Sequence, residues 1–426
     1  MVNDGEETAN MNGTDFVTKY LKHTSGGETP MVFHRWACLT GISAMLEKSV
    51  YLHDGLGNTY PNMYTMLIGS PGTRKSTAIK TMVRYLKKAG YTNTAPEAAT
   101  KEAFLHFMAN SSTTMSANAL GSDPGKMLFQ DINAPSEVST PVMIAADEFQ
   151  NFFSNNIIDF LSMLGELWDY EGPYEGIARG GNIHISNPCV SMITGNTTET
   201  LCRVFPIEAL GQGFFSRQLF IHGEPNGIKI AFPEPPPEDA VNQIVDELRS
   251  LTAVCAGKIE FTPEAKKLAA AIYENYFGSG DPRFTTYEGR RFTHLKKLCI
   301  IHAIADKSSV IEDIHVIRAN TVLTVAEFAM PKALGEYGIS RNSRVMHKIV
   351  TLLEASIEPY THATLLAAVR HDLEKMTDFF PIINALEGSR RIKTSESGHI
   401  LPVRSSLKLD KDDPFIDWGY MSPEEL

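Results

Sequence analysis

One stretch of the chain, residues 62–88, constrains the fold more than any other. It begins with the apolar run Asn62-Met-Tyr-Thr-Met-Leu-Ile68, continues through glycines at 69 and 72, and ends in residues 76–88, where apolar side chains recur at helical spacing. We predict a buried strand, a loop and a helix, in that order. This succession is typical of an α/β fold, in which strands and helices alternate around a largely parallel sheet.

The loop, Gly69-Ser-Pro-Gly-Thr-Arg-Lys-Ser-Thr77, follows the P-loop pattern except that Arg74 stands where the usual pattern has its last glycine. Glycines let backbone amides face phosphate oxygens, and the following helix presents its positive end to them. We expect Lys75 to contact the phosphates of ATP and Ser76 to ligate Mg²⁺. The alternative is a Gly-Pro turn that happens to end in Lys-Ser. The predicted nucleotide-binding residues of the loop are Gly69, Gly72, Thr73, Arg74, Lys75, Ser76 and Thr77.

Two further apolar strands, predicted at 141–146 and 187–194, each end in polar residues. Asp147 and Glu148 follow the first strand, and Asn196 follows the second. Functional groups of parallel sheets gather at the carboxyl ends of the strands. We therefore assign Asp147 to Mg²⁺, Glu148 to the attacking water, and Asn196 to the positioning of that water. The alternatives are an acidic helix start for the pair and an ordinary turn residue for Asn196.

Arginines near two element boundaries are further candidates. Arg217 lies between a glycine-containing turn and an apolar strand, where a guanidinium can neutralise charge on the phosphate of a neighbouring subunit. The alternative for Arg217 is a surface salt bridge. Arg290 and Arg291 begin a predicted helix, and either is a candidate for the arginine that closes on the nucleotide; Arg291 is the one assigned to nucleotide binding.

Residues 174–185 are predicted to form a β-hairpin that turns at Gly180-Gly181. Such a hairpin can project into a pore, and Arg179 and His184 are its predicted contacts to a nucleic-acid backbone. The alternative is an edge hairpin without a ligand.

Charge and composition limit the classes of protein to consider. The formal net charge of −11 argues against a protein that coats nucleic acid with its whole surface, so any such contact must be local. No apolar run approaches the roughly 20 residues that cross a bilayer, and we expect neither membrane insertion nor secretion. The five cysteines include no CxxC pair and are expected to be reduced core residues of a cytosolic protein.

Changes in pattern along the chain predict several units. Thr14 is expected to cap the first helix, and residues 111–140, rich in Ser, Asn, Gly and Pro, are expected to form loops. The last unit, with its interspersed aromatic residues, is either a partner-binding peptide or a solvated tail. The predicted units are a flexible tail at 1–13, a helical segment packed on the core at 14–60, the core at 61–232, a helical lid at 238–338, a winged-helix domain at 342–405, and an acidic tail at 406–426.

Several segments resemble the ATPase domain of phage and mobile-element replicative helicases: GSPGTRKST, VMIAADE, SNPCVSMITGN and GQGFFSRQLFI. More distantly, the order of hairpin, strand-ending Asn, Ser-Arg, lid helix and winged helix is similar to minichromosome maintenance helicases. The resemblance covers about residues 30–330. It implies an AAA+ P-loop NTPase core of α/β class with a parallel sheet, a helical lid domain and a C-terminal winged helix, in which Asn196 is the sensor 1 residue.

The resemblance also implies a function. We expect an ATP-dependent replicative DNA helicase, a hexameric ring that moves along single-stranded DNA in its central pore, in the cytoplasm of a bacterial host if the chain is phage-encoded. Because the sequence shows no primase zinc site, a primase would be a separate partner, as would a loader or a single-strand-binding protein. The alternative is an AAA+ helicase loader or DNA-remodelling ATPase that uses ATP as a switch. A defence or packaging ATPase would use the same motifs.

Overall fold

The computed structural model describes residues 15–425 apart from 56, 121–138, 153–156, 179–180, 206–212, 277, 279–280, 336–340, 357, 374, 389–390, 396 and 403–410. The tail predicted at 1–13 lies outside the described residues. Within the described ranges, every helix is too short or too polar to cross a lipid bilayer.

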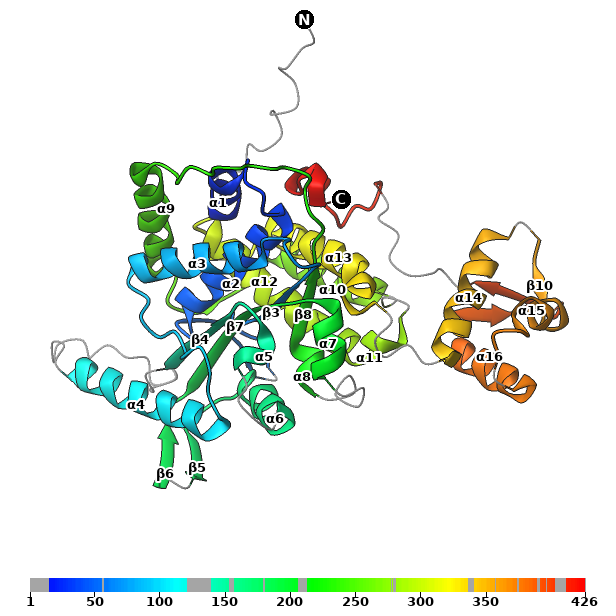
Figure 1. Cartoon of the computed structure of the whole chain (residues 1–426), viewed down its shortest axis with the longest axis horizontal. Helices are drawn as coiled ribbons and strands as arrows, with labels where there is room; N and C mark the ends of the chain where they lie inside the picture. Colours follow the sequence, from blue (N-terminus) through cyan, green and yellow to red (C-terminus); the bar gives the residue numbers. More distant parts are fainter. Residues whose placement is uncertain are drawn as a thin grey trace, which may run out of the picture.

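A four-stranded parallel sheet forms the centre of the larger body (Figure 1). All residues of the two middle strands are buried, as expected when helices cover both faces of a parallel sheet. The α/β class and the parallel sheet are therefore confirmed. In spatial order the strands are β4 (Thr140–Ala146), β7 (Pro188–Asn196), β3 (Tyr64–Ile68) and β8 (Gln218–His222).

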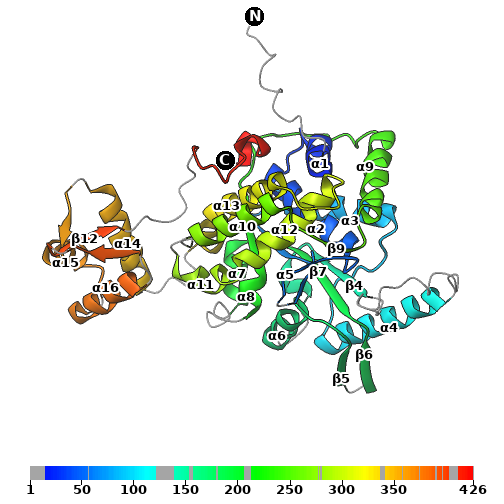
Figure 2. The ribbon, with the colours of Figure 1, turned by 180° about the vertical axis from the view of Figure 1, so that it is seen from behind.

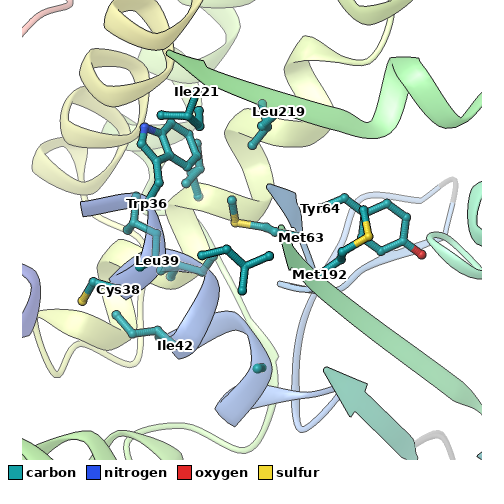
Figure 3. Close-up of a cluster of buried hydrophobic side chains, with 14 of the residues drawn as sticks. Trp36, Cys38, Leu39, Ile42, Met63, Tyr64, Met192, Leu219 and Ile221 are labelled. Atoms are coloured by element: carbon teal, nitrogen blue, oxygen red, sulfur yellow. The ribbon is translucent and has the colours of Figure 1, made fainter. Parts of the chain in front are cut away.

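Helices cover the sheet in two layers. Figure 1 shows α2 (Met31–Leu46) and α3 (Lys75–Ala89) on one side of the sheet, and α5 (Phe149–Phe152) and α6 (Ile157–Leu167) on the other. Helix α2 is apolar on nearly all sides and almost completely buried, which is the pattern of a core helix. Its side chains of Trp36 and Leu39 belong to the buried cluster with Met192 of β7 and Leu219 and Ile221 of β8 (Figure 3).

The first helix, α1 (Phe16–Thr24), begins one residue later than predicted. Asp15, not Thr14, is its N-cap, because Oδ1 of Asp15 accepts a hydrogen bond of 3.0 Å from the backbone N of Thr18. A carboxylate is a strong acceptor and also favours the positive end of the helix. The cap is therefore Asp15.

The prediction of loops from residue 111 is wrong at its start. Helix α4 (Lys101–Leu120) continues through the Ser- and Asn-rich segment that was expected to interrupt it. Its first turns bury Phe104, Leu105 and Met108, and this packing outweighs the weak helix propensity of the residues that follow. Residues 121–138 of the predicted loop lie outside the described part of the chain.

Beyond the exposed proline-rich segment 232–237 the chain is mainly helical. A second sheet connects this part to the beginning of the chain, because β1 (Val50–His53) pairs in parallel with β9 (Gly257–Ile259) and antiparallel with β2 (Asn58–Thr59). The longer helices here are α9 (Glu238–Ser250), α10 (Pro263–Asn275), α12 (Arg291–Ala305) and α13 (Asp313–Leu334). The short helices of this body are α7 (Thr198–Val204), α8 (Gly213–Arg217) and α11 (Thr285–Glu288).

Residues 341–402 form a small unit with a hydrophobic core of its own. Its described residues form three α-helices and a three-stranded antiparallel sheet in the order β10-β12-β11. Its elements are α14 (Arg341–Ala355), β10 (Tyr360–Thr361), α15 (His362–Val369), α16 (Phe379–Gly388), β11 (Ile392–Thr394) and β12 (His399–Pro402).

The described part of the predicted acidic tail, residues 411–425, packs on the larger body. Tyr420 and Met421 are buried, and Phe415 and Trp418 pack against the same core. Arg35 of α2 donates from Nε and Nη2 to the two carboxylate oxygens of Glu425, at 2.6 and 2.8 Å, and both side chains are at most 1% exposed. The interpretation as a solvated tail is therefore wrong for these residues, because aromatic burial and a bidentate ion pair hold them in place.

Candidate functional site

Three strand ends bring the predicted polar residues to one edge of the central sheet. Because β7 lies between β4 and β3, Ala146 pairs with Thr194 and Ile68 pairs with Asn196. The backbone N of Gly69 donates to the carbonyl oxygen of Asn196 at 3.4 Å. The loop after β3, the acidic pair after β4 and the end of β7 are therefore neighbours.

The loop between β3 and α3, residues 69–74, is called the glycine loop below. A Cβ at Gly69 would lie 2.6 Å from the carbonyl oxygen of Gly223 and 2.8 Å from Oγ1 of Thr73, so only glycine fits there. Gly72 has a φ of +87° and Arg74 a φ of +61°, two left-handed residues within one short loop. Helix α3 begins at Lys75, with Ser76 and Thr77 in its first turn, and the amides at the start of a helix point toward the residues that precede it.

Lys75 bends back over the glycine loop. Its Nζ donates to the carbonyl oxygens of Gly69 at 2.8 Å and Ser70 at 3.0 Å, and lies 3.3 Å from Oγ1 of Thr73. Burial lowers the pKa of Lys75, and the charges of Glu148 and Glu199 oppose this shift. An ammonium held by neutral carbonyls can exchange these acceptors for the stronger charge of an anion.

The acidic pair lies at the carboxyl end of β4. Asp147 is half-exposed and forms an ion pair with Lys80 of α3, and Oε2 of Glu148 accepts a hydrogen bond of 3.1 Å from Nε2 of Gln150. A Cβ at Gly195 would lie 2.3 Å from the carbonyl oxygen of Asp147, so the close approach of the two strand ends requires that glycine. The backbone of the acidic pair therefore lies beside the last residues of β7.

The side-chain amide of Asn196 is buried, and one of its polar atoms has no hydrogen-bond partner among the described residues. The residue is 2% exposed, and its Oδ1 accepts a hydrogen bond of 3.0 Å from the backbone N of Thr197. Because Oδ1 is the acceptor in this bond, the other polar atom of the amide is Nδ2. Nδ2 has no hydrogen-bond acceptor among the described residues. Oγ1 of Thr194, two residues earlier in β7, is likewise without a partner in that part of the chain. Buried donors are rarely left unpaired, so the site suits an external acceptor.

The structure places Arg217 at the opposite edge of the sheet from the glycine loop. It directly precedes β8, whose five residues pair in parallel with β3, and a strand of that length spans about 16 Å. Its Nη1 donates to the carbonyl oxygen of Gly213 at 2.7 Å, and its Nη2 lies 3.8 Å from Oδ2 of Asp169. Within one chain, Arg217 is therefore not brought together with Lys75.

Arg290 contacts the same aspartate as Arg217, whereas Arg291 contacts other residues. Nη1 of Arg290 donates to Oδ2 of Asp169 at 2.8 Å, and both guanidinium groups lie over the ring of Trp168, at 5.7 Å for Arg217 and 5.9 Å for Arg290. Burial and the nearby charge of Arg290 lower the pKa of Arg217. The two arginines and Asp169 thus form one cluster.

Arg291, the arginine assigned to nucleotide binding from the sequence, contacts α13 in this structure. Its side chain is buried, and its Nε donates to Oε1 of Glu327 at 2.7 Å. Nη2 also donates to Oδ1 of Asn320 at 2.9 Å. One residue along a helix turns a side chain by about 100°, so Arg291 faces α13 while Arg290 stays half-exposed at the surface.

The predicted hairpin is formed by β5 (Tyr174–Ala178) and β6 (Gly181–Ile185), and it projects from the body in both views (Figures 1 and 2). His184 is exposed, with Nδ1 3.7 Å from the carboxylate of Glu175 across the hairpin. Ile177 is 90% exposed near its end. Arg179, the other predicted contact, lies outside the described residues.

Sequence reasoning missed several charged residues around these positions. Lys80, which pairs with Asp147, lies four residues after Ser76 on the same helix, a spacing that puts both side chains on one face. Asp169 and Glu28 have no motif around them, and only the fold brings them to their arginines.

No cluster of three or more His, Cys, Asp or Glu side chains suited to a metal occurs in the described part of the chain. Ser76 and Asp147 offer one hydroxyl and one carboxylate, which fits Mg²⁺ because that ion usually keeps several waters and binds one or two carboxylates plus phosphate. Comparison with known protein families and with curated proteins finds no match to this chain.

Proposed function

We propose that this chain is an ATPase of the AAA+ type that works as a replicative DNA helicase, in a hexameric ring around single-stranded DNA. The observation that carries the proposal is the meeting of Lys75, Asp147 and the unpaired Nδ2 of Asn196 at one edge of the parallel sheet. A cation, a carboxylate and a neutral donor in this order around a glycine loop suit the terminal phosphates of a nucleotide.

Each residue has a distinct role in the proposal. Lys75 exchanges the carbonyl oxygens of Gly69 and Ser70 for phosphate oxygens, together with the backbone amides at the start of α3. Ser76 and Asp147 would hold Mg²⁺, which supplies positive charge to the phosphates. Glu148 accepts a proton from the attacking water, and Nδ2 of Asn196 donates to that water or to the γ-phosphate.

The position of Arg217 supports a ring. Because a strand length of about 16 Å separates it from the glycine loop of its own chain, it can act only on a nucleotide bound to another subunit. Head-to-tail contacts that repeat by rotation close into rings. The nearby carboxylate of Asp169 would hold the guanidinium ready at such an interface.

Two further features support action on DNA. The β5–β6 hairpin projects from the body, and His184 lies on it as a proposed DNA contact with Arg179. The unit at 341–402 has the three helices and the strands of a winged helix, and we propose that it is one. The helical part between the two, proposed as the lid, would close over the nucleotide.

Binding and turnover of ATP test the proposal. Lys75→Ala should weaken the binding of a fluorescent ATP analogue by at least about tenfold, because one charged phosphate contact is lost. Glu148→Gln should keep binding but slow hydrolysis by about 100-fold or more. Lys332→Ala, which removes an exposed ion pair with Glu224, is the control that leaves both unchanged. Wild-type protein that neither binds nor hydrolyses ATP would refute the proposal.

A mixing experiment tests the ring. Arg217→Ala alone should bind ATP normally and lose hydrolysis by about a thousandfold. Mixed with Lys75→Ala subunits, it should regain part of the activity, because some interfaces then pair an intact Arg217 with an intact Lys75. Stimulation of hydrolysis by single-stranded DNA and unwinding of a forked duplex distinguish a helicase from a loader that uses ATP as a switch.

A further inference from the structure

A carboxylate outside the predicted motifs lies against the glycine loop. Glu28 belongs to the connection between α1 and α2, and its Oε2 accepts a hydrogen bond of 2.6 Å from Nε of Arg74, whose Nη2 contacts the same oxygen. Its Oε1 accepts a hydrogen bond of 2.7 Å from the backbone N of Ile230. One carboxylate therefore joins three segments that are distant along the chain.

The connection that carries Glu28 is itself anchored. Nδ2 of Asn226 donates to the carbonyl oxygen of Gly27 at 2.9 Å, beside the bond between Ile230 and Glu28. The hydrogen bonds from Ile230 and Arg74 lower the pKa of Glu28, so its carboxylate is charged at neutral pH. Arg74 thus meets a negative charge that the surrounding backbone holds in place.

Arg74 needs such support because of its backbone. Its φ of 61° and ψ of 25° are left-handed, a conformation that glycine adopts freely and that residues with a Cβ disfavour. The residue directly precedes Lys75 and the first amides of α3, so its conformation determines where these groups point. Its side chain is 53% exposed, and packing therefore contributes little to holding it.

We propose that Glu28 is a positioning residue of the nucleotide site: by clamping the Arg74 guanidinium, it stabilises the left-handed turn and keeps the glycine loop in its anion-binding shape. The inference rests on the proposed nucleotide site. It also explains why this chain tolerates arginine where the usual P-loop has glycine, since the ion pair supplies what glycine provides by its freedom. Loss of the clamp should weaken nucleotide binding and leave the chemical step alone.

A double-mutant cycle with Glu28→Gln and Arg74→Gly tests this. Glutamine keeps an oxygen for the amide of Ile230 but removes the charge that Arg74 meets. In the wild-type background, Glu28→Gln should weaken binding of a fluorescent ATP analogue by about threefold to tenfold, with kcat at saturating ATP changed less than about twofold. In the Arg74→Gly background, where no side chain needs the clamp, the same change should have no effect. Equal weakening in both backgrounds, no weakening, or tighter binding would overturn the inference.

Hydrogen exchange separates this inference from the proposed function, because it needs no nucleotide. In the nucleotide-free protein, Glu28→Gln should speed exchange of the amides of residues 69–77 at least about threefold, and should not do so in the Arg74→Gly background. Glu224→Gln, which removes another exposed carboxylate partner, is the matched control. Faster exchange in a protein that binds no ATP would support the clamp and refute the nucleotide site. Unchanged exchange together with unchanged binding would refute the clamp alone.

Discussion

The ion pair of Arg35 with Glu425 and that of Arg74 with Glu28 each join separate segments of the chain, yet they differ in exposure. The pair of Arg35 and Glu425 is at most 1% exposed, whereas Arg74 and Glu28 are 53% and 22% exposed. Arg35 also donates from Nη2 to the carbonyl oxygen of Tyr420 at 2.8 Å and lies 4.7 Å from the centre of its ring. The buried pair is thus surrounded by further contacts, while water reaches the pair at the glycine loop.

The difference in exposure distinguishes an ion pair that stabilises the fold from one that lies beside a candidate binding site. An ion pair in water contributes little and can be exchanged for another partner at small cost, whereas removing one member of a buried pair leaves an uncompensated charge. The exposed pairs of Lys80 with Asp147 and Arg74 with Glu28 both lie around the glycine loop. The buried pair instead holds the last residues of the chain against α2.

The largest expected effect is therefore in the buried pair. Glu425→Gln should lower the free energy of unfolding by about 3–5 kcal/mol, because it leaves the Arg35 guanidinium buried without its counter-charge. Urea unfolding followed by circular dichroism measures this loss, with Lys332→Ala at the exposed pair with Glu224 as the control. A loss below about 1 kcal/mol would contradict the contrast between buried and exposed pairs.

A pH titration tests the effect of burial on one titratable group, the imidazole ring of His294. His294 is 1% exposed, its Nε2 lies 3.1 Å from the carbonyl oxygen of Ser216, and burial lowers its pKa to about 3, helped by the nearby charges of Lys297, Arg290 and Arg217. The pKa of His294 in the folded chain is below the ordinary value of 6.5. As the pH falls, His294 therefore binds a proton in the unfolded chain while it stays neutral in the folded chain.

The contribution of His294 to stability is therefore present above pH 6.5 and is lost as the pH falls toward about 3. Its share of the slope should approach about 1.4 kcal/mol per pH unit within that window. His294→Gln, which keeps a donor for Ser216, should make the fall in unfolding free energy between pH 6.5 and pH 4 shallower. Identical slopes for the two proteins would show that His294 does not stay neutral.

The smallest expected effect is at the exposed pair beside the site. Lys80→Ala should change the free energy of unfolding by no more than about 0.5 kcal/mol, because the lysine side chain is 70% exposed. The same urea experiment measures it. A loss of unfolding free energy above about 1 kcal/mol would show that this exposed pair contributes as a buried pair does, contrary to the expectation.

The candidate site could be predicted from sequence largely because its parts are local patterns. The strand before Gly69 and the helix after Arg74 are visible as runs and periods of apolar residues. Polar residues mark the ends of β4 and β7. Parallel strands place their carboxyl ends at one edge, so the neighbourhood of Asp147 and Asn196 followed from the α/β class. The distinction between Arg290 and Arg291 is different in kind, since it depends on which face of α12 meets α13.

The α/β class, the glycine loop and the order of polar residues at the strand ends could be predicted from the amino-acid sequence, because each depends on patterns among residues close together along the chain. The folded chain was needed to show that residues 411–425 pack on the body, that Arg291 is buried, and that Glu28 contacts Arg74. These outcomes depend on burial and on contacts between segments tens to hundreds of residues apart. Both the charge of a titratable side chain and its energy depend on the groups that surround it in the fold.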